Sequence, residues 1–483
     1  MRILIASPEA TPYVKTGGLA DVTGSLLKEF CALKERVSLV VPLYRRIAER
    51  FRLYPAGESI SVPMGALNIT GRVWVSEKTD TPGAYFIECE ELYGRRELYG
   101  TPKGDYRDNA LRFAFFSRAV IETCLAMDVR PDVIHCNDWQ TAMIPLYLKN
   151  FYADRTGMKN TATLYTIHNL GYQGLFPASD IVYTGLGSDY FSPERLEFYG
   201  RLNFMKAGLL YADLLSTVSK TYAAEMLDPE YGFGLEGVLK MRRHDLYGIT
   251  NGLDYEYWDP ASDRFIPKKY DRIDVAGKGL CKKELLREAG LRDGNRPLLG
   301  VVSRFSSQKG LDLIADALDR MVRLGVNVVI FGKGDEYYQN LLASAAEKHS
   351  GRVFVRIGFK ESLAHTIYAG CDFFLMPSRY EPCGLGQMIA LRYGTIPIAR
   401  RTGGLADTIE DYDHLRSRGT GFLFSDYTPT SLLAALKRAL CVYADGKKMA
   451  KLVSDAMKTD FSWKKSAERY VELYGKATKK VAG

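Results

Sequence analysis

Residues 298–322 read LLGVVSRFSSQKGLDLIADALDRMV and contain a complete strand, loop and helix pattern. The run 298–302 is apolar and has the length of a strand. The stretch after it has one apolar face at the spacing of a helix, formed by Leu311, Ile314, Ala315, Leu318 and Val322. A buried strand that runs through a polar loop into an amphipathic helix is half of a βαβ unit. This stretch therefore predicts an α/β fold.

Similar strand-sized apolar runs recur along the whole chain, at 3–6, 37–41, 85–87, 133–135, 163–167, 328–331, 353–357 and 373–376. Amphipathic stretches separate many of them, which predicts parallel sheets covered by helices. Residues 255–267 carry two prolines and no periodicity, so we expect a linker there. The domains on either side are then an N-terminal domain over 1–254 and a C-terminal domain over 268–458.

The last segment, 459–483, is expected to be a helix that packs on another surface. Trp463, Tyr470 and Tyr474 share one face of that helix, and large aromatic side chains on one face need to be covered.

Composition excludes several classes of protein. The chain has 483 residues with 46% hydrophobic and 25% charged residues, which is typical of a folded globular protein. A net charge of +8 without a basic stripe argues against nucleic acid as a partner. No apolar window approaches the ~18 residues of a membrane span. The cysteines form no CxxC pair. The apolar run at the start of the sequence is too short for a signal sequence, so we expect a cytoplasmic protein.

The hexapeptide TGGLAD occurs twice, at 16–21 and at 402–407, once in each predicted domain. In both places an apolar run precedes it and a helical pattern follows. Paired glycines between a strand and a helix let the backbone approach a ligand closely, and the N–H groups at a helix start attract anions. Each copy alone is also compatible with a simple connecting turn.

A second candidate feature follows the apolar run at 298–302. Arg304 and Lys309 lie five residues apart beyond the end of a predicted strand, where parallel sheets bind ligands. Hydrogen bonds from charged groups are stronger than the effect of a helix terminus, so these two cations are expected to dominate the binding of a diphosphate.

Polar residues also follow other predicted strands. Glu381 lies in the stretch PSRYEPCGLG at 377–386, directly after the strand 373–376. In the first domain His168 and Asp138 follow the strands 163–167 and 133–135. A single glutamate or histidine in such a place is also compatible with a surface or structural role.

Together these stretches resemble the signature motifs of bacterial glycogen synthases, which are relatives of plant starch synthases. The matching motifs are KTGGLADV at 15–22, TIHNL at 166–170, GITNGLD at 248–254, RF and KG at 304–305 and 309–310, RYEPCGL at 379–385 and RTGGLADT at 401–408. The resemblance implies two Rossmann-like domains that face a deep interdomain cleft, the GT-B arrangement, with the C-terminal helix crossing back to the N-terminal domain. It also implies retaining transfer of glucose from ADP-glucose to the non-reducing 4-hydroxyl of an α-1,4-glucan, such as glycogen or a maltooligosaccharide, without a cofactor or metal.

The resemblance further implies roles for individual residues. Arg304 and Lys309 would bind the diphosphate, and Glu381 would contact the donor sugar as a positioning and electrostatic group. His168 would hold the glucose near its 6-hydroxyl, while Asp138 and Asn251 would line the sugar side. The other expected substrate contacts are Lys15 and Gly18 from the first domain, the adenine contact Phe359, and the positions Thr16, Gly17, Asp21, Cys383, Gly384, Leu385, Thr402, Gly403 and Gly404.

Three positions depart from the family pattern. The stretch 137–140 reads Asn-Asp-Trp-Gln where the family has His-Asp-Trp-His, and Ile389 stands where many retaining relatives have a second glutamate. Asp411 and Asp413 form a DxD that resembles the metal motif of a different glycosyltransferase fold, and we interpret it as a solvated turn.

Two alternatives to an ADP-glucose enzyme remain at the level of the sequence, and a third is excluded by the length of the chain. The nearest is a glucosyltransferase or starch synthase that uses UDP-glucose. A non-catalytic glucan-binding scaffold would have lost Arg304, Lys309 or Glu381, and a pyridoxal-phosphate glucan phosphorylase would be far longer.

Overall fold

The computed structural model describes residues 1–57, 59–76, 83–101, 104–292 and 295–482. The chain divides into two compact units. Unit 1 comprises Met1–Val218, Ala223–Gly252 and Trp463–Gly483, and unit 2 comprises Ser219–Tyr222 and Leu253–Ser462. The α/β class and the return of the last helix to the first unit are thus confirmed.

Unit 1 is built on one large twisted sheet with the strand order β15-β14-β10-β9-β1-β2-β6-β5-β3. Its strands are β15 Leu246–Gly248, β14 Leu214–Thr217, β10 Ala162–Ile167, β9 Val133–Asn137, β1 Arg2–Ala6, β2 Arg36–Pro42, β6 Ala84–Glu88, β5 Leu67–Ser76 and β3 Leu53–Pro55. The pairs from β15 to β6 are parallel, while β5 is antiparallel to β6, to β3 and to β4 Ile60–Met64. All five strands predicted in the first domain are present, as β1, β2, β6, β9 and β10.

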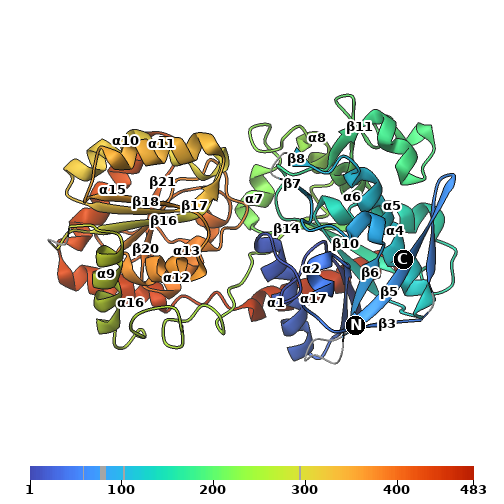
Figure 1. Ribbon diagram of the computed structural model, residues 1–483, viewed down its shortest axis with the longest axis horizontal. Helices are drawn as coiled ribbons and strands as arrows, with labels where there is room; N and C mark the ends of the chain where they lie inside the picture. The colour runs from blue at the N-terminus through green and yellow to red at the C-terminus, as the bar shows by residue number, and fades with distance from the viewer. Residues whose placement is uncertain (58, 77–82, 102–103, 293–294, 483) are drawn as a thin grey trace. The chain divides into compact units, whose positions relative to one another are not determined.

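Helices and small strand pairs complete unit 1 (Figure 1). The helices are α1 Gly18–Ala32, α2 Arg45–Ala48, α3 Glu90–Tyr93, α4 Asn109–Ala126, α5 Met143–Phe151, α6 Phe204–Tyr211, α8 Glu236–Met241 and α17 Trp463–Ala482, with α7 Lys220–Glu225 at the chain crossing. The small pairs are β7 Gly100–Thr101 with β8 Gly104–Asp105, and β13 Arg201–Asn203 with β11 Leu175–Pro177 and β12 Glu197–Phe198. Among the described helices, none combines the length and the apolar character that crossing a bilayer requires.

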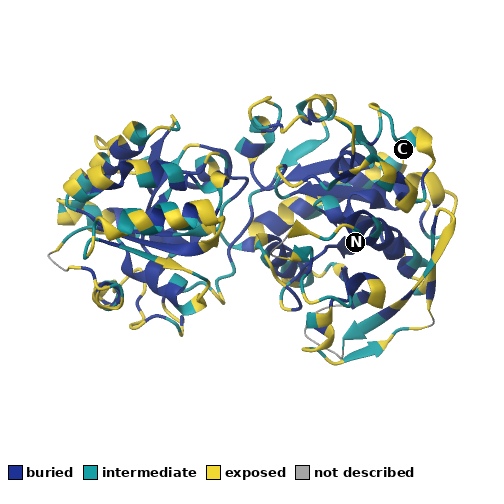
Figure 2. Cartoon of the chain, turned by 45° about the horizontal axis from the view of Figure 1, so that its top comes forward, coloured by how far each residue is buried: buried dark blue, intermediate teal, exposed yellow. Residues whose placement is uncertain are grey.

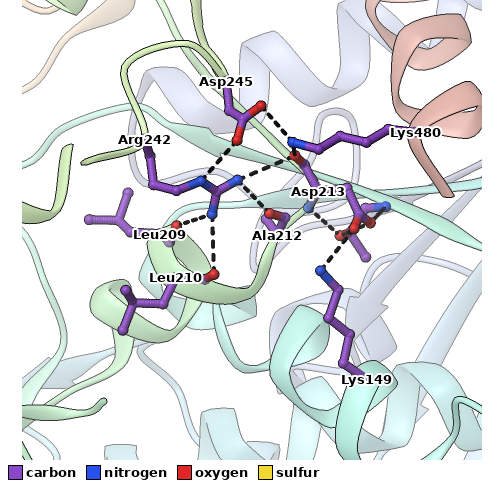
Figure 3. Close-up of polar contacts among 9 residues, drawn as sticks. Lys149, Leu209, Leu210, Ala212, Asp213, Arg242, Asp245 and Lys480 are labelled. Atoms are coloured by element: carbon purple, nitrogen blue, oxygen red, sulfur yellow. Dashed lines mark hydrogen bonds and ion pairs between the residues drawn. The ribbon is translucent and has the colours of Figure 1, made fainter. Parts of the chain in front are cut away.

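The apolar face of α17 is buried in unit 1, as its three aromatic residues predict. Trp463, Tyr470 and Tyr474 are all buried, and the Tyr474 hydroxyl lies 2.8 Å from Nδ1 of the buried His135 on β9. At the far end of α17, Lys480 Nζ donates to the backbone oxygen of Asp213 (3.1 Å) and to Oδ1 of Asp245 (2.6 Å) (Figure 3). The helix is therefore an integral part of unit 1.

The burial of Tyr474 predicts a large loss of stability when its ring is removed. Tyr474→Ala is expected to lower the free energy of unfolding of unit 1 by ~3–5 kcal/mol, since a large core ring is replaced by a cavity. At roughly 2–4 °C per kcal/mol, calorimetry should show a melting temperature about 10 °C lower. Glu472→Ala, at an exposed position of the same helix, is the control and should leave it unchanged. Equal melting temperatures for both variants would contradict the packing of α17.

Unit 2 contains a sheet that is parallel throughout, with the strand order β18-β17-β16-β19-β20-β21. The strands are β16 Leu298–Phe305, β17 Asn327–Gly334, β18 Val353–Ile357, β19 Phe373–Met376, β20 Ile396–Arg400 and β21 Phe422–Phe424. The helices are α9 Ala276–Glu288, α10 Leu311–Arg323, α11 Glu336–Glu347, α12 Glu361–Gly370, α13 Gly386–Arg392, α14 Gly403–Thr408, α15 Pro429–Tyr443 and α16 Gly446–Met457.

Alternate side chains of the central strands of unit 2 enter two different core clusters. Val328 and Ile330 of β17 pack in the cluster that includes α10 and α11, whereas Val329 and Phe331 pack in the cluster that includes α9 and α12. This is why these strands are apolar at every position rather than at every second one. Figure 1 shows α10 and α11 on one face and α9 and α12 on the other, and Figure 2 shows their outer surfaces exposed.

Residues 255–267, which the sequence predicts as a linker, belong to the body of unit 2. The Trp258 ring stacks on the His365 ring with 4.1 Å between centroids. Asp263 Oδ2 lies 2.7 Å from His365 Nδ1 and accepts a hydrogen bond from the Tyr393 hydroxyl at 2.6 Å. The segment lacks periodicity because it is held by individual side chains, not because it is free.

Candidate active site

The predicted phosphate-binding residues of unit 2 follow β16. Arg304 is exposed at the end of this strand, and Lys309 lies in the short 3-10 turn Ser307–Lys309 before α10. Gly310 ends the turn with a φ of +67°, and a Cβ there would lie 2.0 Å from the backbone oxygen of Pro377. A glycine is therefore required at 310, and it brings the loop carrying Lys309 against the loop that follows β19.

The close approach of these loops joins Lys309 to Glu381. Lys309 Nζ lies 2.9 Å from Oε1 and 2.7 Å from Oε2 of Glu381. The Glu381 residue is only 4% exposed, and its Oε2 also accepts a hydrogen bond from Ser378 Oγ at 2.9 Å. A carboxylate that is buried to this extent needs such a partner, because an unpaired charge there is strongly destabilising.

The second TGGLAD copy holds the backbone of the same loop. Gly404 N donates to Glu381 O at 3.0 Å, and Gly403 has a φ of +44° with its hypothetical Cβ 1.9 Å from that oxygen. Thr402 is buried and forms the N-cap residue of α14. Gly403 and Gly404 thus lie against the loop that carries Glu381, and both glycines are needed for packing within unit 2.

The turn at Cys383, Gly384 and Leu385 is fixed by a residue that the sequence did not single out. Gln387 Nε2 donates to the backbone oxygens of Cys383 and Gly384 and to Thr408 Oγ1, each at 3.0 Å. Gln387 is completely buried, and Gly384 has a φ of +73°. This turn therefore has one defined conformation beside Glu381.

Two other predicted features of unit 2 lie apart from this cluster. Phe359 follows β18, and its side chain is almost free of neighbours at 89% exposure. Asp411 of the DxD accepts hydrogen bonds from Arg438 Nη2 and from Leu423 N, both at 2.8 Å, and Tyr412 between the two aspartates is buried. The interpretation as a solvated turn holds for Asp413, whose Oδ1 accepts from Leu415 N at 2.8 Å in an exposed turn. It is wrong for Asp411, which is partly buried and paired with Arg438. Among the described residues, no cluster of His, Cys, Asp or Glu has the arrangement of a metal site.

In unit 1 the first TGGLAD copy is held by Glu9, a residue that no sequence motif marks. Glu9 is buried, and its Oε2 accepts hydrogen bonds from Thr16 N (2.5 Å) and Gly17 N (3.2 Å). Its Oε1 accepts from Thr16 Oγ1 at 2.9 Å and from the Tyr99 hydroxyl at 3.1 Å. Glu9 follows β1 at the carboxyl end of that strand, and this position is the sequence signal that could have indicated it.

Lys15 and Asp21 form an ion pair across this first copy, with Lys15 Nζ 2.8 Å from Asp21 Oδ1. Gly18 begins α1 and Gly17 is its N-cap residue. Gly17 has an extended φ of −148°, and a Cβ at this position would meet no atom within 4 Å. Neither conformation nor packing in unit 1 requires a glycine there, in contrast to the second copy.

This contrast predicts different effects of the same substitution. If the first copy approaches a ligand through its backbone, Gly17→Ala should raise the KM for the donor at least tenfold and leave the melting temperature unchanged. Gly404→Ala should instead destabilise unit 2, because its Cβ would lie 2.1 Å from Cys383 O. Steady-state kinetics and calorimetry on both variants check this. Normal kinetics for Gly17→Ala would show that no ligand approaches this loop closely.

Asp138 has the most unusual backbone of the predicted site residues. Its φ of +57° and ψ of −178° lie in a region that only glycine normally occupies, and such strain costs about 1–3 kcal/mol. The conformation is held by Asp138 N, which donates to Thr166 O at 3.0 Å, and by Oδ1, which accepts from His168 N at 2.8 Å. Burial, and to a smaller extent the Glu9 carboxylate, raises the pKa of Asp138 to about 7. Strain and a perturbed pKa in one residue indicate a functional position.

His168 lies beside Asp138 with a defined tautomer. Asn137 Nδ2 donates to the backbone oxygens of Ala6 and His135, so Asn137 Oδ1 faces His168 Nε2 at 2.9 Å and accepts a hydrogen bond from its N–H. Burial lowers the pKa of His168 to about 3, which keeps the ring neutral at neutral pH. Nδ1 of His168 is then a hydrogen-bond acceptor suited to a hydroxyl group.

Asn251, the last predicted residue of unit 1, follows β15. It is 8% exposed, and no donor in the described part of the chain reaches its Oδ1. A buried amide oxygen without a partner is compatible with a ligand that supplies the missing hydrogen bond.

The structure therefore gathers the predicted residues at the carboxyl edge of each sheet. In unit 1 they follow β1, β9, β10 and β15, and in unit 2 they follow β16, β18, β19 and β20. Carboxyl edges of parallel sheets are where α/β proteins bind ligands.

Comparison with known proteins assigns both units. Residues 2–241 match the family described as starch synthase catalytic domain, and residues 282–458 match glycosyl transferases group 1. The chain is 47% identical to a glycogen synthase from Geotalea daltonii over 98% of both proteins. It is 44% identical to one from Thermodesulfovibrio yellowstonii, over 98% of this chain and 97% of that relative.

Comparison with solved structures supports the same assignment. The catalytic domain of starch synthase IV from Arabidopsis thaliana, bound to ADP and acarbose, matches with a TM-score of 0.90 and 33% identity over 99% of both chains. A sucrose-phosphate synthase from Thermosynechococcus elongatus, 17% identical, shares the fold with a TM-score of 0.62 over 98% of both chains. Two α/β glycosyltransferase units of this kind are typical of GT-B enzymes. The chain is a glycosyltransferase and belongs to the glycogen synthase family, which shares its catalytic domain with the starch synthases.

Proposed function

We propose that this glycosyltransferase transfers glucose from ADP-glucose to the non-reducing 4-hydroxyl of an α-1,4-glucan, with retention of the anomeric configuration. The observation that carries the proposal is the ion pair between Lys309 and the buried Glu381, which two loops 72 residues apart bring to the carboxyl edge of a parallel sheet. The ADP and acarbose bound to the related starch synthase IV support both the donor nucleotide and the glucan acceptor.

In this reaction Arg304 and Lys309 bind the diphosphate. The expected backbone N–H donation by the second TGGLAD copy is wrong for two of its residues, because Thr402 N already donates to Arg400 O and Gly404 N to Glu381 O, both at 3.0 Å. Gly403 and Gly404 instead hold the loop that carries Glu381. Glu381 and the turn from Cys383 to Leu385 contact the donor sugar, and the exposed ring of Phe359 covers the adenine. The remaining contacts come from unit 1, where Lys15, Thr16, Gly17, Gly18 and Asp21 approach the donor and Asp138, His168 and Asn251 bind sugar hydroxyls.

The bond between the anomeric carbon and the diphosphate oxygen breaks, and the electron pair leaves with the phosphate. The acceptor 4-hydroxyl attacks from the same face, and its proton passes to the departing phosphate oxygen. The two cations stabilise the charge that develops on the phosphate in the transition state. Glu381 acts as an electrostatic and positioning group rather than as a nucleophile.

We propose that the reaction needs no metal or cofactor, because Arg304 and Lys309 supply positive charge for the phosphates. EDTA is therefore expected to leave the initial rate within about twofold of the untreated enzyme. Activity that is lost on chelation and restored by Mg²⁺ or Mn²⁺ would contradict this.

The donor is tested by measuring nucleotide release with ADP-glucose and with UDP-glucose, each with and without maltohexaose. We expect acceptor-dependent ADP release and a much lower rate with UDP-glucose. Preferential use of UDP-glucose would assign a different donor to the same site. Absence of transfer from both donors would instead support a glucan-binding scaffold. We also propose a cytoplasmic location, where ADP-glucose would be available.

A further inference from the structure

The carboxylate of Glu381 depends on two side chains for its orientation. The Lys309 ammonium group donates to both carboxylate oxygens, and Ser378 Oγ donates one hydrogen bond to Oε2 at 2.9 Å. Ser378 is 1% exposed, so this hydroxyl is shielded from water and directed at Glu381. Lys309 and Ser378 have different roles in the proposed reaction, because only Lys309 also has to bind the donor.

Lys309 faces two anionic partners once the donor is present. Its Nζ is within hydrogen-bond distance of both Glu381 oxygens in the structure described here. When the ammonium group turns toward the diphosphate, it gives up some or all of its contact with Glu381. The hydrogen bond from Ser378 does not depend on the donor and remains in place.

The backbone around Glu381 is already fixed and leaves only the side chain to be oriented. Arg379 N donates to Gln308 O at 2.9 Å, and Gly404 N donates to Glu381 O at 3.0 Å. Ser378 itself follows β19 directly after Pro377, whose oxygen is in close contact with Gly310. The Ser378 hydroxyl therefore has a defined position relative to the Glu381 backbone.

We propose that Ser378 is a positioning residue that keeps the Glu381 carboxylate directed at the donor sugar while Lys309 binds the diphosphate. The inference rests on the proposed function and adds a residue to its machinery. Ser378 touches neither donor nor acceptor and acts only through Glu381.

Removal of the hydroxyl should therefore affect turnover more than donor binding. Ser378→Ala is expected to lower kcat about ten- to hundredfold, the range of a hydrogen bond to a charged group, and to change the KM for ADP-glucose less than threefold. Thr161→Val is the control, since it removes another buried hydroxyl. Thr161 directly precedes β10, at the end of this strand that is away from the predicted site residues. The control variant should leave kcat unchanged.

A double-mutant cycle tests whether Ser378 acts through Glu381. Transfer of radiolabelled glucose to maltohexaose is measured for the native chain, Ser378→Ala, Glu381→Ala and the double variant. We expect Ser378→Ala to change the rate less than twofold when Glu381 is already alanine. An equal loss in both backgrounds would overturn the inference, as would a raised KM with an unchanged kcat.

A matched pair of variants covers the case in which Ser378→Ala does not fold. Ser378→Thr and Ser378→Val have side chains of nearly equal size, and only threonine keeps the hydroxyl. The threonine variant should retain at least ten times the kcat of the valine variant, and equal values would overturn the inference. The native chain in the same assay tests the proposed function separately. If it is active with either donor, the double-mutant cycle tests the role of Ser378. If it is inactive with both donors, the proposed function and this inference are both overturned.

Discussion

Arg304→Ala is expected to lower kcat about a thousandfold and to leave the melting temperature unchanged. A unit charge ~4 Å from the diphosphate contributes about 4 kcal/mol at an effective dielectric constant of ~20, and 1.36 kcal/mol corresponds to about a factor of ten in rate. Arg304 is exposed at the end of β16, so its loss should not disturb the core of unit 2. Kinetics with ADP-glucose and calorimetry measure the two effects.

Lys309→Ala should lose a similar amount of activity but also some stability. The variant leaves the buried Glu381 carboxylate without its charged partner, which is a destabilising change. The double variant Lys309→Ala, Glu381→Gln removes that unpaired charge and should recover the melting temperature without recovering activity. More than a tenth of native activity in Arg304→Ala or Lys309→Ala would refute the assignment of these cations to the phosphate.

Asp138→Asn is expected to lower kcat more than a hundredfold while making unit 1 more stable at alkaline pH. The activity falls because Oδ1 stays engaged by His168 N, so asparagine presents its NH2 group to the sugar where the native chain has Oδ2, and an NH2 group cannot accept a hydrogen bond from a sugar hydroxyl. The gain in stability comes from the pKa of Asp138, which burial raises from 3.8 to about 7.

The direction of this pH effect follows from proton binding. Between pH 4 and pH 7 the folded chain retains a proton on Asp138 that the unfolded chain releases, so the native chain loses stability as the pH rises through this window. The loss has an upper limit of ~4 kcal/mol. Asparagine resembles the protonated form at all pH values and avoids the loss. The two proteins should therefore melt at similar temperatures near pH 4.5, and the variant should melt higher at pH 8.

Thermal unfolding of both proteins across this pH range measures the effect. Asp138→Glu serves as a control, because it keeps a titratable carboxyl group. Its longer side chain places this group one methylene further from the backbone. Identical pH profiles for the native chain and Asp138→Asn would show that Asp138 titrates normally.

The strands were the most predictable part of the fold. Buried parallel strands are apolar at nearly every position, so runs such as 298–302 and 373–376 are visible in the sequence. The antiparallel β5, at Leu67–Ser76, was missed because its apolar residues alternate with polar ones and form no continuous apolar run, although such alternation is itself typical of a half-exposed strand. The segment 255–267 shows the opposite case, since packing by individual side chains leaves no periodic pattern.

The site residues were predictable where a motif marked them. Lys309 and Glu381 lie in recognisable stretches, and their ion pair requires only that two strand ends be neighbours, as β16 and β19 are. Glu9 and Gln387 act by holding loops through single side chains, and no spacing in the sequence distinguishes such residues from other polar ones. The strained backbone of Asp138 is likewise a property of the folded chain.

The reaction proposed for this chain is the addition of glucose from ADP-glucose to a glucan with retention of configuration. The most direct measurement is NMR of the product formed from ADP-[1-¹³C]glucose and maltohexaose, with ADP measured in the same sample. This reaction yields maltoheptaose with a labelled α-anomeric carbon in a 1,4 linkage at the non-reducing end, and one ADP for each glucose transferred. A β-anomeric signal, labelled free glucose as the main product, or unchanged ADP-glucose would contradict it.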